Sequence, residues 1–80
     1  MEISVVLFGI ARDIVGERHL KLSVNETCQV DELKEIIVNK FPKFEDLKHI
    51  SVAVNSEYAR GETVLKPGDE IAIIPPVSGG

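Results

Sequence analysis

The segment from residue 30 to residue 41, VDELKEIIVNKF, decides the fold. Its apolar residues recur at steps of three and four positions: Val30, Leu33, Ile37 and Phe41. This spacing places them on one face of an α-helix, and the acidic residues at its start and the lysine at its end suit the helix dipole. Pro42 then stops the helix. We therefore predict a helix over residues 30–40 that buries a single face.

Strand-like segments lie on both sides of this helix. Before it, residues 3–8 are mostly apolar and residues 19–24 alternate between apolar and polar side chains. After it, residues 50–54 alternate, residues 58–59 suit a very short strand, and residues 70–74 follow a Pro-Gly turn. The short first connection predicts an antiparallel pair, and the long intervening chain allows the last strand to run parallel to the first. We expect the first strand to be central and buried on both faces.

A helix with one apolar face needs one sheet face to bury it. The prediction is therefore an α+β domain with the β-grasp, or ubiquitin-like, roll. It would have a mixed sheet of four to five strands with one main helix packed on one face. Residues 1–74 would form this domain and residues 75–80 an extended, flexible tail. The 80-residue length leaves room for one small core.

The composition excludes several classes of function. The 13 acidic and 9 basic side chains give a net charge of −4, and no basic stripe is present, which argues against nucleic acid as a partner. The longest apolar runs span four residues, too few to cross a membrane. The single cysteine, Cys28, offers neither an internal disulfide nor a metal cluster. We therefore expect no metal site. Because Met1-Glu2 does not begin a secretory signal, we also expect a cytoplasmic protein.

No group of side chains in the sequence forms a recognisable catalytic centre. The sequence has neither a Ser-His-Asp arrangement nor a Gly-rich phosphate loop. His19 and His49 both lie at the start of strand segments, where they are expected to face solvent. We therefore expect no bound cofactor, and we do not expect the chain to be an enzyme by itself.

The closing residues have a different character, because two prolines and two glycines follow the last strand: Pro75, Pro76, Val77, Ser78, Gly79 and Gly80. Prolines end the sheet ladder and keep the backbone extended, so six residues reach about 18–20 Å. Glycines add no side chain, which makes a thin arm that could enter a narrow tunnel in another protein. The carboxylate of Gly80 is ionised at neutral pH and must be activated before it can react. Because the chain shows no ATP site, we expect a separate enzyme to use ATP for this step.

Several segments resemble one family closely: residues 65–80, with the Pro-Pro-Val-Ser-Gly-Gly ending; residues 6–16, with an Arg-bearing turn that ends in glycine; and residues 52–55 followed by Tyr58-Ala59. They resemble the small subunit of molybdopterin synthase, the sulfur carrier of molybdenum cofactor biosynthesis, within the ubiquitin-like sulfur-carrier superfamily. The resemblance covers nearly the whole chain, and the tail is its most specific part.

The resemblance implies a function and a set of partners. A ubiquitin-activating-type enzyme would adenylate Gly80, and a sulfurtransferase would supply the sulfur that turns it into a thiocarboxylate. The chain would then dock on the synthase large subunit, with two copies of each chain in the complex. Its tail would donate sulfur to cyclic pyranopterin monophosphate, which forms the molybdopterin dithiolene. This chain would be the non-catalytic, sulfur-donating subunit.

The resemblance also implies which residues contact the partners. These are the tail residues Pro75, Pro76, Val77, Ser78 and Gly79, together with Ile74, Phe8 and Arg12. Phe8 and Ile74 are candidates for an apolar surface on the sheet face away from the helix, with core packing as the alternative. Arg12 would pair with an acidic group on the activating enzyme, or would be an ordinary surface arginine.

Three other functions are also compatible with the sequence. The same tail chemistry suits a ubiquitin-like modifier attached to lysines of other proteins. It also suits a sulfur carrier for thiamine or thiolated tRNA synthesis, although those relatives usually lack the Pro-Pro segment. Finally, the chain could be a β-grasp binding module with an idle tail.

Overall fold

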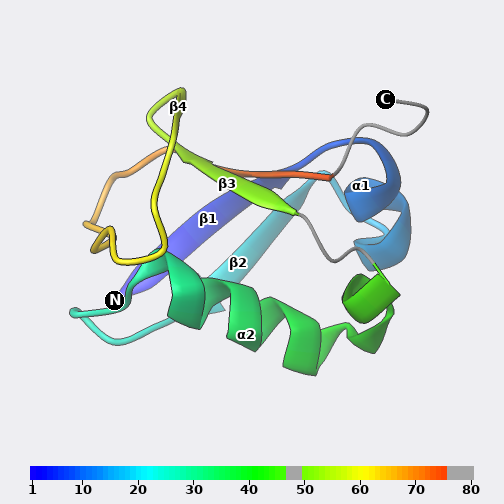
Figure 1. The fold of residues 1–80 in the computed structure, drawn as a ribbon, viewed down its shortest axis with the longest axis horizontal. Helices are drawn as coiled ribbons and strands as arrows, with labels where there is room; N and C mark the ends of the chain where they lie inside the picture. Colours follow the sequence, from blue (N-terminus) through cyan, green and yellow to red (C-terminus); the bar gives the residue numbers. More distant parts are fainter. Residues whose placement is uncertain (47–49, 76–80) are drawn as a thin grey trace.

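The computed structural model describes residues 1–46 and 50–75 (Figure 1). Its elements follow in this order: β1 (Glu2–Leu7), α1 (Gly9–Val15), β2 (His19–Ser23), α2 (Val30–Lys40), the 3-10 helix η1 (Pro42–Asp46), β3 (Ser51–Val54), β4 (Glu57–Tyr58) and β5 (Ile71–Ile74). The predicted main helix over residues 30–40 is confirmed at both ends.

The five strands form one mixed sheet in the order β2-β1-β5-β3-β4. β1 runs antiparallel to β2 and parallel to β5, as the sequence predicts. β3 is antiparallel to both β5 and β4. Figure 1 shows α2 lying across one side of this sheet, so the domain has two layers. We call the opposite side of the sheet its outer face; it is the upper side in Figure 1.

The core lies between α2 and the sheet. The buried residues of α2 are Val30, Leu33 and Ile37, as the spacing predicts. The predicted burial of the first strand on both faces is wrong, because its side chains alternate and Glu2 and Ser4 are exposed. The reason is that a helix layer covers only one face of the sheet, so alternate side chains meet solvent. Phe8 lies outside the strand and is 52% exposed.

The N-terminus of α2 is capped by backbone rather than by a side chain. Gln29, in the capping position, makes no side-chain hydrogen bond to the helix. Instead, the amide of Val30 donates to the carbonyl of Thr63 at 2.9 Å, and the amide of Asp31 donates to the carbonyl of Gly61 at 2.9 Å. A Cβ atom at Gly61 would overlap the Asp31 carboxylate. The loop after β4 thus satisfies amide groups that a capping side chain normally binds.

An aromatic pair, one ring buried and one partly buried, closes the end of the core beyond α2. Phe44 in η1 is 1% exposed, and its ring packs edge-on against Phe41 with 6.3 Å between ring centroids. The sequence indicates only a loop or short turn from residue 44 to residue 48, because no periodic pattern runs through it. The structure instead places a helical turn up to Asp46 and makes Phe44 a core residue.

The turn between β3 and β4 contains two residues with left-handed backbone: Asn55 at φ 54° and Ser56 at φ 70°. Asparagine tolerates this conformation, but serine is strained in it. We expect Ser56→Gly to raise the free energy of unfolding by up to about 1 kcal/mol, since relief of strain exceeds the added flexibility of the unfolded chain. Urea denaturation measures this. The matched change Ser23→Gly, in the extended backbone of β2, should lower stability instead, and a loss of stability in both variants would contradict the assignment of strain.

Candidate functional site

A row of side chains crosses the outer face through all five strands. The strand register places His19 of β2 opposite Val6 of β1, Val6 beside Ala72 of β5, Ala72 opposite Ala53 of β3, and Ala53 opposite Tyr58 of β4. Between the two end residues the row is apolar. Tyr58 is 75% exposed although its ring is large. An apolar strip on a solvent-facing sheet marks a candidate interaction surface.

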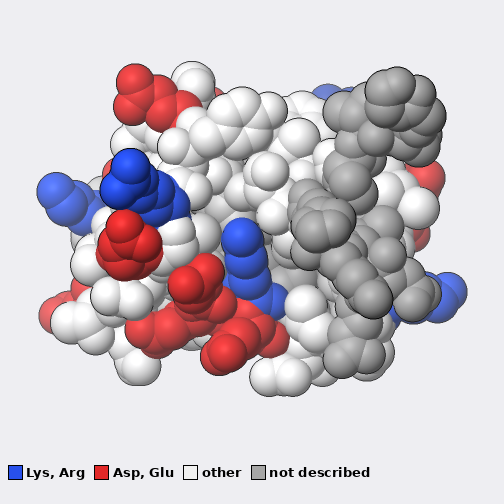
Figure 2. Space-filling view, viewed as in Figure 1, with Lys and Arg blue, Asp and Glu red and all other residues white. Residues whose placement is uncertain are grey.

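A second line of residues extends this strip toward the end of β5. Ile74 is paired with Ser51 on β3, and Phe8 follows the end of β1, which runs parallel to β5. Most residues of the two lines also line a hollow, which we call the apolar hollow. Its lining residues are Val6, Phe8, Ala53, Ser56, Tyr58, Glu70, Ile71, Ala72 and Ile74. In Figure 2 the upper side of the molecule, which is the outer face seen edge-on, carries fewer charged side chains than the lower side.

The apolar hollow runs along β5, from Glu70 and Ile71 at its start to Ile74 at its end, where the chain continues into Pro75. Pro75 follows β5 directly and is half-buried. A Cβ atom at Gly9 would stand 3.6 Å from Cγ of Pro75, so the chain leaves β5 beside the start of α1. Beside the hollow, toward the start of β1, the exposed residues of the outer face are polar: Glu2, Ser4 and Lys21. A partner bound over the Ile74 end of the hollow would therefore be next to Pro75, where the closing residues begin.

The structure brings together some of the site residues expected from the sequence. Phe8 and Ile74 both line the apolar hollow, as the outer-face interpretation requires, and neither is a core residue. Arg12 is exposed on α1, away from the hollow lining. Their contacts with partners stay predictions. Pro76, Val77, Ser78, Gly79, Gly80 and His49 lie outside the described residues.

Sequence reasoning missed other residues of the hollow. Val6, Ala53, Ala72 and Tyr58 reach it through strand register, which a single segment does not reveal. The alternation of the last strand could have identified part of this surface, because Ile71 and Ile73 are buried under the helix layer. Alternation then directs Ala72 and Ile74 to the outer face.

Cys28 carries the single thiol of the chain, a group that can act as a nucleophile in sulfur transfer. Its surroundings suppress that reactivity. Its side chain is 1% exposed. Burial raises the pKa of the thiol, and the negative charge of Glu32 raises that pKa further. The reactive thiolate is therefore scarce at neutral pH, and Cys28 is better described as a core residue.

Other kinds of site receive no support from the described part of the chain. Within residues 1–46 and 50–75, His, Cys, Asp and Glu side chains form no cluster of three or more that could hold a metal ion. Over the same residues, no helix has the length and apolar character needed to cross a membrane.

Comparisons with known proteins agree with this architecture. The ThiS family matches residues 5–80. A molybdopterin synthase sulfur carrier subunit from Arabidopsis thaliana is 36% identical over 81 residues, covering 100% of this chain and 84% of the relative. The crystal structure of SAMP1, a small archaeal modifier protein, from Haloferax volcanii superimposes with a TM-score of 0.84 at 28% identity and covers 100% of both chains.

A third comparison comes from an assembled complex. The protein-protein complex of subunits 1 and 2 of molybdopterin-converting factor from Helicobacter pylori contains a chain that is 31% identical. That chain has a TM-score of 0.68 and a coverage of 100% in both directions. The predicted β-grasp, ubiquitin-like fold is confirmed by these structural matches. Because the family match and the Arabidopsis alignment both span nearly all of its length, the chain belongs to the ThiS family.

Proposed function

We propose that this chain is the sulfur-carrier subunit of a molybdopterin synthase and carries its sulfur as a thiocarboxylate on Gly80. The observation that carries the proposal is the apolar hollow beside the start of the closing residues, in a chain similar over its full length to named sulfur carrier subunits. In this proposal the hollow is a docking surface, and the closing residues, which begin at Pro75 after Ile74 of the hollow, are the arm that carries the sulfur.

The proposed chemistry begins with activation of the Gly80 carboxylate. A carboxylate is a poor acyl donor, because its leaving group would be oxide. A ubiquitin-activating-type enzyme would therefore join it to the adenylate of ATP and release pyrophosphate. A persulfide sulfur held by a sulfurtransferase then attacks the Gly80 carbonyl carbon and AMP leaves, which gives an acyl disulfide. A second thiol attacks the donor's sulfur in this S–S bond, so that a new disulfide forms on the donor and the thiocarboxylate leaves with the electron pair. ATP belongs to the activating enzyme in this scheme, and this chain binds no cofactor.

The proposed transfer step takes place on the synthase large subunit. Phe8 and Ile74 would contact that subunit through the hollow, and Pro75, Pro76, Val77, Ser78 and Gly79 would thread toward its active site. The thiocarboxylate sulfur would pass to cyclic pyranopterin monophosphate, and two such transfers form the dithiolene. The complex would hold two copies of each chain. Arg12 would contact an acidic group on the activating enzyme.

Truncation of Phe8 tests the docking part of this proposal. Because Phe8 is half-exposed and lines the hollow, we expect Phe8→Ala to weaken binding to the purified large subunit about tenfold or more, with little change in stability. Titration calorimetry measures the dissociation constant. Val64→Ala is the matched control, because Val64 is also an exposed apolar residue, at 43%, but lies outside the hollow. Equal affinity of the two variants would place the docking surface elsewhere.

A second candidate function is conjugation to other proteins, and the match to a small archaeal modifier protein favours it. The same acyl adenylate, attacked by a lysine amine, gives an amide bond and releases AMP. Trypsin would leave a long remnant on the modified lysine, because Lys66 is followed by Pro67 and the next site upstream is Arg60. A protease that cuts after Val77 would instead leave Ser-Gly-Gly on lysines. Mass spectrometry that finds no such remnant in cells with active synthase would contradict this second function.

A further inference from the structure

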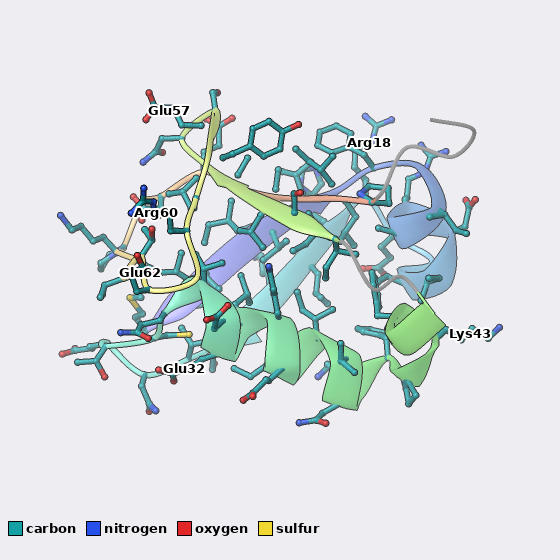
Figure 3. All side chains as sticks on the ribbon, in the orientation of Figure 1. Arg18, Glu32, Lys43, Glu57, Arg60 and Glu62 are labelled. Atoms are coloured by element: carbon teal, nitrogen blue, oxygen red, sulfur yellow. The ribbon has the colours of Figure 1, made fainter. Side chains whose placement is uncertain are left out.

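Two parallel strands, β1 and β5, end side by side, and their chains then part. The last register pair between them joins Leu7 to Ile73. One residue further along each chain, Phe8 and Ile74 both line the apolar hollow. The end of β1 is held in place, because the amide of Leu7 donates a hydrogen bond to the carbonyl of Arg18 at 2.7 Å. Figure 3 shows Arg18 near the end of β5, so the closing residues begin beside a fixed neighbour.

Gly9 is the residue at which the two chains part. Phe8 has extended backbone, with φ −124° and ψ 153°, whereas Gly9 has left-handed backbone, with φ 55°. This change of direction ends the strand and begins α1, whose first turn is closed by a hydrogen bond from the amide of Ala11 to the carbonyl of Phe8 at 3.1 Å. β5 continues directly into Pro75. The turn at Gly9 therefore takes β1 away from the sheet at the point where the closing residues begin.

Pro75 lies next to the bare backbone of Gly9. A Cβ atom at Gly9 would stand 3.6 Å from Cγ of Pro75, which is the separation of two carbon atoms in van der Waals contact. A methyl group therefore fits beside the proline ring, but a longer side chain has to turn away from the ring or displace it. Pro75 is half-buried, and its nitrogen donates no hydrogen bond to a neighbouring strand. Its position therefore depends on the packing of its ring more than on the sheet ladder.

We propose that Gly9 is a positioning residue for sulfur transfer. Because Gly9 has no side chain, Pro75 can lie against the start of α1, and this sets the point from which the closing residues leave the domain. The inference rests on the proposed function, which supplies the reaction; Gly9 acts through Pro75 and takes no part in the chemistry. A side chain that moves Pro75 moves the start of the arm, and a displacement of about 1 Å at the reacting group can cost about 100-fold in rate.

Two substitutions of increasing size test the inference. Asparagine and histidine both occur in left-handed backbone, so Gly9→Asn and Gly9→His should fold, which circular dichroism checks. Each variant is loaded with its Gly80 thiocarboxylate by the activating enzyme and sulfur donor, and intact mass measures the loading. The rate of a single sulfur transfer is then measured with saturating large subunit and cyclic pyranopterin monophosphate, at about pH 8, where histidine is neutral. We expect a loss of about threefold or more for Gly9→Asn and about tenfold or more for Gly9→His.

Binding distinguishes positioning from docking, because Gly9 adjoins Phe8, which the proposed function places in the interface. Titration calorimetry should give dissociation constants for the large subunit within about threefold of that of the natural chain, since the apolar hollow is unchanged. Gly9→Ala adds only a methyl group, which reaches contact with Pro75 without displacing it. This variant should transfer sulfur within about twofold of the natural rate.

Gly16→Asn and Gly16→His are the matched controls. Gly16 follows the end of the same helix in left-handed backbone, at φ 88°, and a Cβ atom there would meet none of the described residues within 4 Å. Because these controls carry similar backbone strain and the same added atoms, they should transfer sulfur within about twofold of the natural rate.

Three results would overturn the positioning inference while the proposed function stands. The position-9 variants could transfer sulfur as fast as the Gly16 controls, or lose activity only through weaker binding. Gly9→Ala could also be as slow as Gly9→His, which would assign the effect to backbone strain. A natural chain that carries the thiocarboxylate but transfers no sulfur with the large subunit overturns both the inference and the proposed function.

Discussion

Deletion of Gly80 is expected to lower molybdopterin formation by at least about 100-fold, with no change in the free energy of unfolding. The shortened chain still ends in a carboxylate, now on Gly79, but this group is drawn back by about 3.5 Å. A displacement of even 1 Å from the productive geometry can cost about 100-fold in rate. The measurement is molybdopterin formation in an assay reconstituted with the activating enzyme, the sulfur donor and the large subunit.

A second tail variant distinguishes the effect of the arm's length from the effect of its thickness. Gly79→Val keeps the length of the arm and the carboxylate of Gly80 but adds a β-branched side chain. If the tail enters a narrow tunnel, this variant should also fail in sulfur transfer while still binding through the apolar hollow. Normal molybdopterin formation by the Gly80 deletion would contradict the proposed carrier chemistry, and normal activity of Gly79→Val would contradict threading alone.

Phe44→Ala is expected to lower the free energy of unfolding by about 3–5 kcal/mol. Phe44 is the largest of the fully buried side chains and closes the end of the core beside Phe41. A domain of this size has little stability to lose, so the variant should be partly or wholly unfolded at room temperature. Urea denaturation followed by circular dichroism measures the change.

Phe8→Ala is the matched control for this prediction, because it removes the same atoms from a half-exposed position on the outer face. It should cost much less stability than Phe44→Ala while costing more in binding to the large subunit. Two variants with the same loss of stability would contradict the division of the aromatic residues into a core residue and a docking residue.

Much of the fold could be predicted because the periodic segments are clear. The three- and four-residue spacing from Val30 to Ile37 predicts the helix and its buried face, and the structure agrees at both ends. Phe44 could not be assigned in this way, because it belongs to no periodic segment and is buried only through its packing against Phe41. The burial of β1 was overestimated, since an apolar run does not show that one of its faces lacks a covering layer.

The candidate surface was predictable only in part, and the chemistry of the closing residues stays a prediction. The Pro-Pro and Gly-Gly pairs indicate an acyl-carrying arm from the sequence alone, and the family resemblance identifies Phe8 and Ile74. Tyr58 and Ala53 join the same surface only because β3 pairs with β5 in one register. The backbone cap that Gly61 and Thr63 give to α2 depends on contact across the fold and has no local signal.

Whether Gly80 carries sulfur is read directly from the intact mass of the chain isolated from cells that contain its activating enzyme and sulfur donor. We expect a species heavier by the replacement of one oxygen with sulfur, and fragmentation should place that change on Gly80. A chain lacking the activating enzyme should show only the plain acid. If the plain acid alone is found while molybdopterin is being made, Gly80 is not the sulfur carrier.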